Sequence, residues 1–179
     1  KYRELRGDEV DTAEEVSALS DLYRWQQKLQ LSLGQADAAI ATLRELDKHI
    51  PRDEQFFEER QRVAIEIANV LEGARGDRTA AISSLEQLLI AEPLALSALE
   101  RLAALVQAAG DTSRAQGLYR KFIDEARRLA RESISRVEPA KAAPFQALAK
   151  IFGWQKAGDA QQLALQAAMV IENDRLHRA

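Results

Sequence analysis

The sequence between residues 62 and 129 holds one pattern twice: RVAIEIANVLEGARGDRTAAISSLEQLLIAEPLA (62–95) and LSALERLAALVQAAGDTSRAQGLYRKFIDEARRL (96–129). The two stretches align without gaps, so that Gly76-Asp77 falls on Gly110-Asp111 and Ala81 on Ala115. A fixed period of about 34 residues predicts a repeat architecture in which each copy is one pair of helices.

Each shared position has a physical reason. A glycine followed by an aspartate ends one helix and begins the next, because Gly adopts the left-handed conformation and the Asp carboxylate accepts hydrogen bonds from free amides. The small alanine lets the two helices of a pair cross closely. Pro93 stops the second helix before the next copy begins. Apolar residues recur between these markers at helical spacing, so the pattern predicts antiparallel helices hinged at the glycine.

Two weaker copies flank this pair. Residues 20–53 carry Gly34 at the turn, Ala39 at the small position and Pro51 at the end. Residues 144–177 carry Gly158-Asp159, which we take as the fourth turn.

The copies are not evenly spaced. About eight extra residues, EQFFEERQ (54–61), separate the first copy from the second, and we expect them to lengthen a helix. The longer gap before the last copy predicts an unusually long helix from about 113 to 137, with residues 130–143 as a helical extension.

Composition agrees with an all-α protein. Ala, Leu, Arg, Glu and Gln dominate, and only four prolines and eight glycines interrupt them. A net charge of -3 gives no global argument for nucleic acid or a membrane surface, and we expect neither nucleic-acid binding nor membrane insertion. The absence of cysteine excludes disulfides and thiolate sites. No signal peptide and no initiator Met are visible, so we expect a segment of a longer protein and assign no compartment.

The chain resembles the tetratricopeptide repeat family over about residues 12–177. The resemblance rests on the aromatic slot at Tyr23, on Leu102-Ala103, on the small and turn positions given above, and on Tyr119, Pro51 and Pro93. The copies are degenerate, because the Trp, Leu-Gly and Tyr of the family motif are mostly missing from the first helices. The composition is similar to that of multi-repeat scaffold proteins of Gram-negative bacteria.

The resemblance implies a single domain, a right-handed α-solenoid of about four hairpins, in which the first helix of each pair lines a concave groove. The groove would bind a protein or peptide segment through recurring positions of each repeat. On this sequence those positions give Arg24, Lys28, Leu31, Glu66, Val70, Glu100, Gln107, Phe145, Leu148, Phe152, Gln155 and Lys156. Some family members clamp a terminal carboxylate with Lys, Asn and Arg at such positions. Acidic Glu66 and Glu100 stand there instead, so we expect no such clamp.

Several conspicuous residues have a structural interpretation. Trp25 and Trp154 lie on first helices, and we expect both to pack in the core, with a partner-binding anchor as the alternative. Phe56 and Phe57 are adjacent and cannot both face one core, so one of them should be exposed.

Charged and metal-ligating residues also have a structural interpretation. His49 and His177 have no second ligand at helical spacing, which argues against a metal site. The paired acids at 53–54, 58–59 and 8–11 stand among arginines and predict a solvated, ion-paired surface. Arg120, Arg127 and Arg131 could form a basic stripe for an anionic partner, but interleaved acids favour ordinary local ion pairs.

The last helix is apolar around much of its circumference. Leu163, Leu165, Met169 and Val170 leave no polar outer face, although a terminal repeat needs one. Either further repeats follow or this surface pairs with another chain, which would allow self-association.

The sequence therefore predicts a scaffold or adaptor domain and no enzyme. We expect no catalytic residue, cofactor or metal, because no nucleophile, base and orienting group can be assembled. The alternatives are a structural spacer without a groove ligand, and a regulatory repeat domain of an enzyme.

Overall fold

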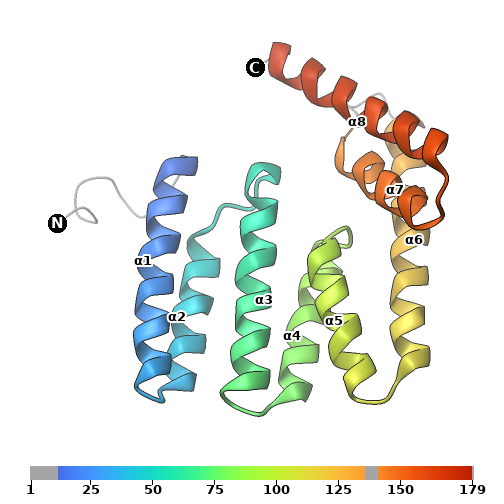
Figure 1. Cartoon of the computed structure of the whole chain (residues 1–179). Coiled ribbons are helices and arrows are strands. Elements are labelled where there is room, and N and C mark those ends of the chain that lie inside the picture. Colours follow the sequence, from blue (N-terminus) through green and yellow to red (C-terminus); the bar gives the residue numbers. More distant parts are fainter. Residues whose placement is uncertain (1–11, 136–140, 179) are drawn as a thin grey trace. The chain divides into compact units, whose positions relative to one another are not determined.

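The computed structural model describes residues 12–135 and 141–178, and within these ranges the chain is helical with no strand (Figure 1). The prediction of an all-α protein is confirmed. In chain order the elements are α1 (Ala13–Ser32), α2 (Ala36–His49), the short 3-10 helix η1 (Glu54–Phe56), α3 (Phe57–Gly73), α4 (Arg78–Ala91), α5 (Leu96–Ala108), α6 (Thr112–Ser135), α7 (Ala143–Trp154) and α8 (Gly158–Arg178).

The helices fall into two compact units. One contains the described residues up to Ala91 together with Ser97–Leu105, that is, α1 to α4 and most of α5. The other contains Glu92–Leu96 and the described residues from Val106 onward, which include α6, α7 and α8.

Consecutive helices pack as hairpins within each unit. In the first unit α1 packs on α2, α3 on α4, and α2 on α3, so two hairpins lie side by side (Figure 1). In the second unit α7 packs on α8 and α6 on α7. Fully buried aliphatic side chains such as Leu43, Leu46 and Leu85 fill the first unit, and Ile151 belongs to the core of the second. Burying each such side chain contributes about 1.5–3 kcal/mol.

Three of the four turns are built as the sequence predicted. Gly34, Gly76 and Gly110 have φ of 74°, 70° and 90°. This is the left-handed region, which Gly adopts without a steric cost. Asp77 Oδ1 accepts a hydrogen bond from Ala80 N at 2.9 Å, and Asp111 Oδ1 accepts one from Arg114 N at 2.9 Å. Each aspartate therefore caps the helix that follows its glycine.

The fourth turn differs from the prediction. Gly158 is the first residue of α8, and the residue with left-handed backbone is Lys156, at φ 56°. Lys156 N donates to Gly153 O and Ala157 N donates to Phe152 O, as Gly110 N and Asp111 N do to Gln107 O and Val106 O. The prediction that Gly158-Asp159 forms the turn is wrong, because the helix-ending hydrogen bonds form two residues earlier.

The corrected turn shifts the whole fourth copy by two residues. Leu148-Ala149 then aligns with Leu102-Ala103, the pair that the predicted register had left unmatched. Gln161 takes the position of the small alanine. Its side chain lies against Gly153, where an added Cβ would stand 3.1 Å from Gln161 Nε2. In this hairpin the small residue has therefore moved from the second helix to the first.

The predicted boundaries hold at some ends and fail at others. Helix α1 begins at Ala13, before the first predicted copy at residue 20, because Thr12 and Glu15 form a capping box. The inserted residues 54–61 form η1 and the first turn of α3, so they lengthen a helix only in part. Phe56 in this insertion is buried and Phe57 half-buried, so the two differ in burial but neither is exposed as expected.

The insertion is held by one buried arginine. Arg60 is 4 % exposed, and its Nη1 donates to the carbonyls of Pro51 at 2.7 Å and Asp53 at 2.9 Å. These bonds satisfy backbone oxygens in the connection between α2 and α3. Further along, α6 is long, as predicted, and reaches Ser135. Residues 130–135 of the second predicted extension belong to α6, residues 136–140 lie outside the described residues, and residue 143 begins α7.

Candidate partner-binding surfaces

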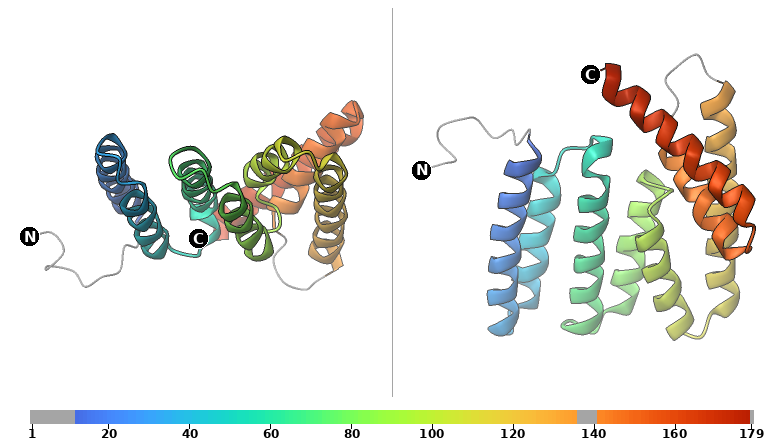
Figure 2. Two further views of the ribbon diagram at one scale, coloured as in Figure 1. Left: turned by 90° about the horizontal axis from the view of Figure 1, so that it is seen from below. Right: turned by 45° about the horizontal axis from the view of Figure 1, so that its top comes forward.

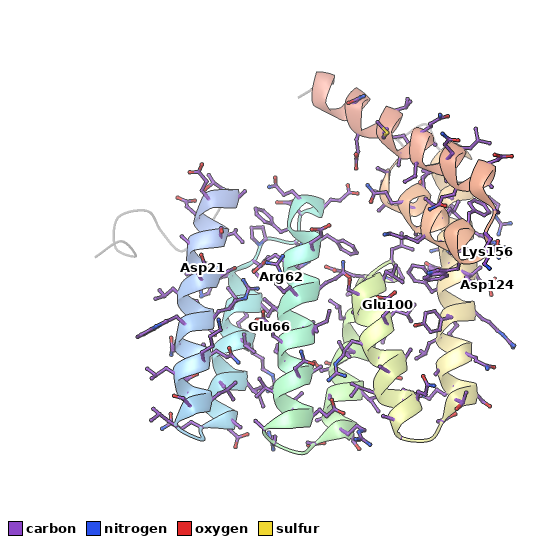
Figure 3. All side chains as sticks on the ribbon, viewed as in Figure 1. Asp21, Arg62, Glu66, Glu100, Asp124 and Lys156 are labelled. Carbon is purple, nitrogen blue, oxygen red and sulfur yellow. The ribbon has the colours of Figure 1, made fainter. Side chains whose placement is uncertain are left out.

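Two charged residues of the predicted groove belong to an ion-pair cluster. Arg24 on α1 donates from Nη2 to Glu59 Oε1 at 2.7 Å and from Nε to Glu66 Oε1 at 2.9 Å. Glu59 also pairs with Arg62 at 3.0 Å. These contacts join α1 to α3, and Figure 3 labels Arg62 and Glu66 on the latter helix. Two predicted groove residues, Arg24 and Glu66, are thus brought together and bind each other.

The carboxylates of this cluster stabilise the charged form of Arg24. Burial by itself lowers the pKa of Arg24, but the carboxylates of Glu66 and Glu59 outweigh that effect and leave the pKa above its ordinary value. The side chain of Arg24 is only 16 % exposed. An incoming anion would have to displace two carboxylates that already hold the guanidinium, so this end of the surface is a poor anion site.

The other predicted residues of the first two copies have mixed positions. Lys28 is exposed and Leu31 half-buried. Val70 is 5 % exposed and belongs to the core, so its prediction as a ligand contact is wrong. The reason is that α3 packs on both α2 and α4, which leaves little of it uncovered.

A second ion-pair cluster joins α3 to α5. Arg101 Nη2 lies 2.5 Å from Glu72 Oε2, and its Nε donates to Asn69 Oδ1 at 2.8 Å. The hydrogen bond from Arg101 is the main reason that the pKa of Glu72 lies below its usual value, with a smaller contribution from Arg78. Glu100, the neighbour of Arg101, is exposed and makes no ion pair with the described residues, so it stays available to a ligand (Figure 3).

The predicted residues of the second unit depend on the corrected register. Phe145, Leu148 and Phe152 are half-buried rather than exposed, and Gln155 and Lys156 lie in the turn itself. Shifting the copy by two residues moves the recurring positions to solvent-exposed Gln146 and Lys150. Gln146 Nε2 already donates to Glu172 Oε1 at 2.7 Å. Gln107, from the third copy, is exposed as a groove residue should be.

An aromatic cluster lies between α6 and α7. The ring of Trp154 stands edge-on to Tyr119 at 5.8 Å and tilted to Phe122 at 6.3 Å between centroids. Phe122 is buried, whereas Trp154 remains partly exposed. The expectation that Trp154 packs in the core is therefore met only in part, since its side chain is 45 % exposed. Lys156 and Asp124 are labelled near this region in Figure 3.

Trp25 contradicts the prediction of a core residue. Its side chain is 66 % exposed, and Leu22 and Leu29 on the same helix and Leu33 at its C-cap are exposed as well. These four residues form a continuous apolar stripe, which we call the α1 stripe. Sequence reasoning missed it, although the spacing of three and four residues along α1 contained the signal.

Helix α8 carries exposed apolar residues, as its sequence indicated. Leu163, Leu165, Met169 and Val170 are exposed, while Ala164 and Ala168 face the core. Whether further repeats or another chain cover them stays a prediction.

The remaining candidates keep their structural interpretation where they are described. His49 Nε2 lies 3.4 Å from Glu45 Oε1, and its ring packs near that of Tyr23. The side chain of His177 and the acids at 8–11 lie outside the described residues. Arg128 pairs with Glu125 and Glu132, beside the exposed Arg127. In the described ranges no group of acidic or histidine side chains could hold a metal ion, and no helix has the length and hydropathy to cross a bilayer.

A scan against protein-family models gives no match for this chain, and searches of curated proteins and of solved structures also return none.

Proposed function

We propose that this chain is a tetratricopeptide-like domain that binds a protein or peptide segment and serves as a scaffold or adaptor. Its helical hairpins would continue one another as a right-handed solenoid, with the first helices α1, α3, α5 and α7 lining the ligand surface. The observation that carries the proposal is the exposure of polar residues at the recurring positions of first helices, namely Glu100 and Gln107 on α5 and, in the corrected register, Lys150 on α7. A peptide laid along these helices would meet these side chains.

The turn geometry supports the family resemblance. Four helix pairs turn through one left-handed residue each, and in three of these turns the next residue donates to the carbonyl five positions back. The small residue follows five positions after each left-handed glycine, and Ala39, Ala81 and Ala115 are all buried. A repeated local geometry of this kind is what a repeat protein requires.

A structural spacer is the second candidate, and the ion-pair clusters favour it. Arg24 ties α1 to α3, and Arg101 ties α3 to α5. Side chains that bind equivalent helices to each other stiffen an array and leave fewer groups for a ligand. The spacer would stack on neighbouring repeats and bind nothing along its first helices.

Site-specific photo-crosslinking separates the two candidates. A photoreactive residue replaces Glu100, which is exposed on the first helix α5, or Gln87, which is exposed on the second helix α4 and serves as the matched control. If the scaffold proposal is right, the probe at Glu100 traps a partner in cells that make the protein, and the probe at Gln87 does not. Crosslinks that join the Glu100 probe only to the protein itself would refute the groove and favour the spacer.

A further inference from the structure

The α1 stripe is built like one side of a helix–helix seam. Leu22, Trp25, Leu29 and Leu33 follow one another at spacings of three and four residues, and exposed Ala18 extends the series towards the N-terminus. This is the spacing that places side chains on one face of a helix facing a partner helix. Leu22 is 59 % exposed and Leu33 63 %, so the seam is open.

The stripe lies opposite the face by which α1 joins its own unit. The buried residues of α1 are Val16, Ser20 and Gln27, about half a helical turn away from the stripe. Figure 2 shows α1 at the edge of its unit, with α2 and α3 on the other side. A helix with apolar residues on both faces is suited to burial on both sides.

We propose that the α1 stripe pairs with the α1 stripe of a second copy of this chain, with the two helices antiparallel. In that arrangement Leu22 packs against Trp25 of the second copy, and Ala18 packs against Leu29 of the second copy. Each of these contacts occurs twice about a two-fold axis, as a symmetric dimer requires. The large Trp meets a Leu and the larger Leu29 meets the small Ala18, so the layers are complementary in size. This inference goes beyond ligand binding and does not depend on it.

Charge complementarity favours a second copy as the partner of the α1 stripe, and it favours antiparallel pairing of the two helices. Asp21 and Lys28 are exposed, stand two helical turns apart on the same edge of the stripe, and make no ion pair among the described residues. Antiparallel pairing brings Asp21 of one copy beside Lys28 of the other, twice. A parallel pair in register would instead place Asp21 near Gln26 and Lys28 near Leu33, with no opposite charges in contact. The stripe is therefore complementary to itself in one direction only.

A charge-swap series tests the pairing in the 179-residue chain. Sedimentation velocity over micromolar to submillimolar concentrations should show a reversible dimer. Asp21→Lys alone, or Lys28→Asp alone, places two like-charged pairs across the seam and should weaken the dimer about tenfold. The double variant Asp21→Lys/Lys28→Asp restores opposite charges and should bring dissociation back to within about threefold of the original.

Cysteine crosslinking tests the register independently. The chain contains no cysteine, so Ala18→Cys and Leu29→Cys can be made singly without background. Mixed and oxidised, the two variants should form a disulfide-linked dimer rapidly. Neither should do so alone, because residues 18 of the two copies would be separated by about 16 Å along the seam at a rise of ~1.5 Å per residue.

Control variants separate loss of dimer from loss of fold. Trp25→Glu should abolish dimerisation while leaving helical content unchanged, and it should leave the thermal midpoint unchanged at concentrations where the original chain is monomeric, since the side chain is mostly exposed. Leu163→Glu on α8 should leave the dimer intact. Any one of three results overturns the proposal. The original chain stays monomeric, or the double charge swap does not restore dimerisation, or Leu163→Glu abolishes the dimer while Trp25→Glu keeps it. The monomer would mean that a different segment or protein covers the stripe. Crosslinking from Glu100 is unaffected by Trp25→Glu, so the two proposals fail separately.

Discussion

The position of the fourth turn leads to a quantitative prediction about glycine. Gly110 and Gly158 belong to the same compact unit and each stands where two helices meet, but only Gly110 has left-handed backbone. A Cβ added at either glycine would meet nothing within 4 Å. Replacing each by alanine therefore changes only backbone energetics, and the pair of variants is matched for packing.

The magnitudes follow from backbone energetics. A residue with a Cβ costs roughly 1–2 kcal/mol in the left-handed region. Replacing glycine by alanine also removes unfolded-state freedom, which stabilises the native state by about 0.4–1 kcal/mol where the backbone permits. We expect Gly110→Ala to lose about 1 kcal/mol of unfolding free energy in total. Gly158→Ala should instead gain a few tenths of a kcal/mol or more, since it lies in ordinary helical conformation. Lys156→Gly should gain up to about 1 kcal/mol by relieving the left-handed lysine.

Urea titration followed by circular dichroism measures these differences, with the slope m checked in each variant so that a change in midpoint reports a change in stability. Because Gly110, Lys156 and Gly158 lie in one unit, all three variants are compared within the same transition. A Gly158→Ala variant that loses as much as Gly110→Ala, together with a Lys156→Gly variant that gains nothing, would show that the turn forms at Gly158 and that the corrected register is wrong.

Three other measurements follow from the packing and the ion pairs. Leu43→Ala should cost about 2–5 kcal/mol of unfolding free energy in a urea titration, because the side chain is fully buried. A loss below about 1 kcal/mol would contradict the packing. A double-mutant cycle of Arg24→Ala and Glu66→Ala should give a coupling of about 1 kcal/mol that shrinks in high salt, and a coupling near zero would show that the pair does not form. Glu72 has a lowered folded pKa, so its contribution to stability is present above its unfolded value of about 4.5 and is lost as pH falls through the folded pKa. Glu72→Gln should therefore lose less stability than the original chain between pH 5 and pH 3, and identical acid profiles would refute the contact with Arg101.

Local signals account for what the sequence predicted well. The left-handed glycines and the capping aspartates act through hydrogen bonds a few residues long, so their identity suffices to place the helix ends. The repeat period fixes the same geometry in successive copies. The capping box at Thr12 and Glu15 was equally local and could have placed the start of α1 correctly.

The fourth copy shows how a local signal can mislead. Gly158-Asp159 matches the turn motif, yet the chain turns at Lys156, because the hydrogen bonds that end α7 form there. The left-handed conformation of a lysine costs only roughly 1–2 kcal/mol. The better guide was Leu148-Ala149, which repeats Leu102-Ala103; Ala149 is buried and Leu148 half-buried. The alignment of the copy that buries its core residues is therefore favoured over the one that places glycine at the turn. Burying one side chain contributes about as much free energy as the left-handed lysine costs.

Trp25 marks the limit of periodicity. The apolar residues of α1 recur at helical spacing on two faces, and the spacing alone does not tell which face a neighbouring helix covers. Val16, Ser20 and Gln27 are buried although two of them are polar, while Trp25 and Leu22 are left outside. Tertiary packing made that choice, and no pattern within α1 encodes it.

The fate of Arg24 and Glu66 suggests a rule for separating ligand contacts from internal contacts in such arrays. The two residues occupy the same position of consecutive copies, and equivalent positions on neighbouring first helices lie close together. Opposite charges there bind each other, as the 2.9 Å contact between them records. Glu66 and Glu100 also occupy that position in consecutive copies, but like charges cannot pair. Glu100 is consequently exposed without an ion pair among the described residues. Under the proposed function, a cationic or amide-rich segment of the ligand would contact it, so Glu100 is the position at which a charged ligand contact is best tested.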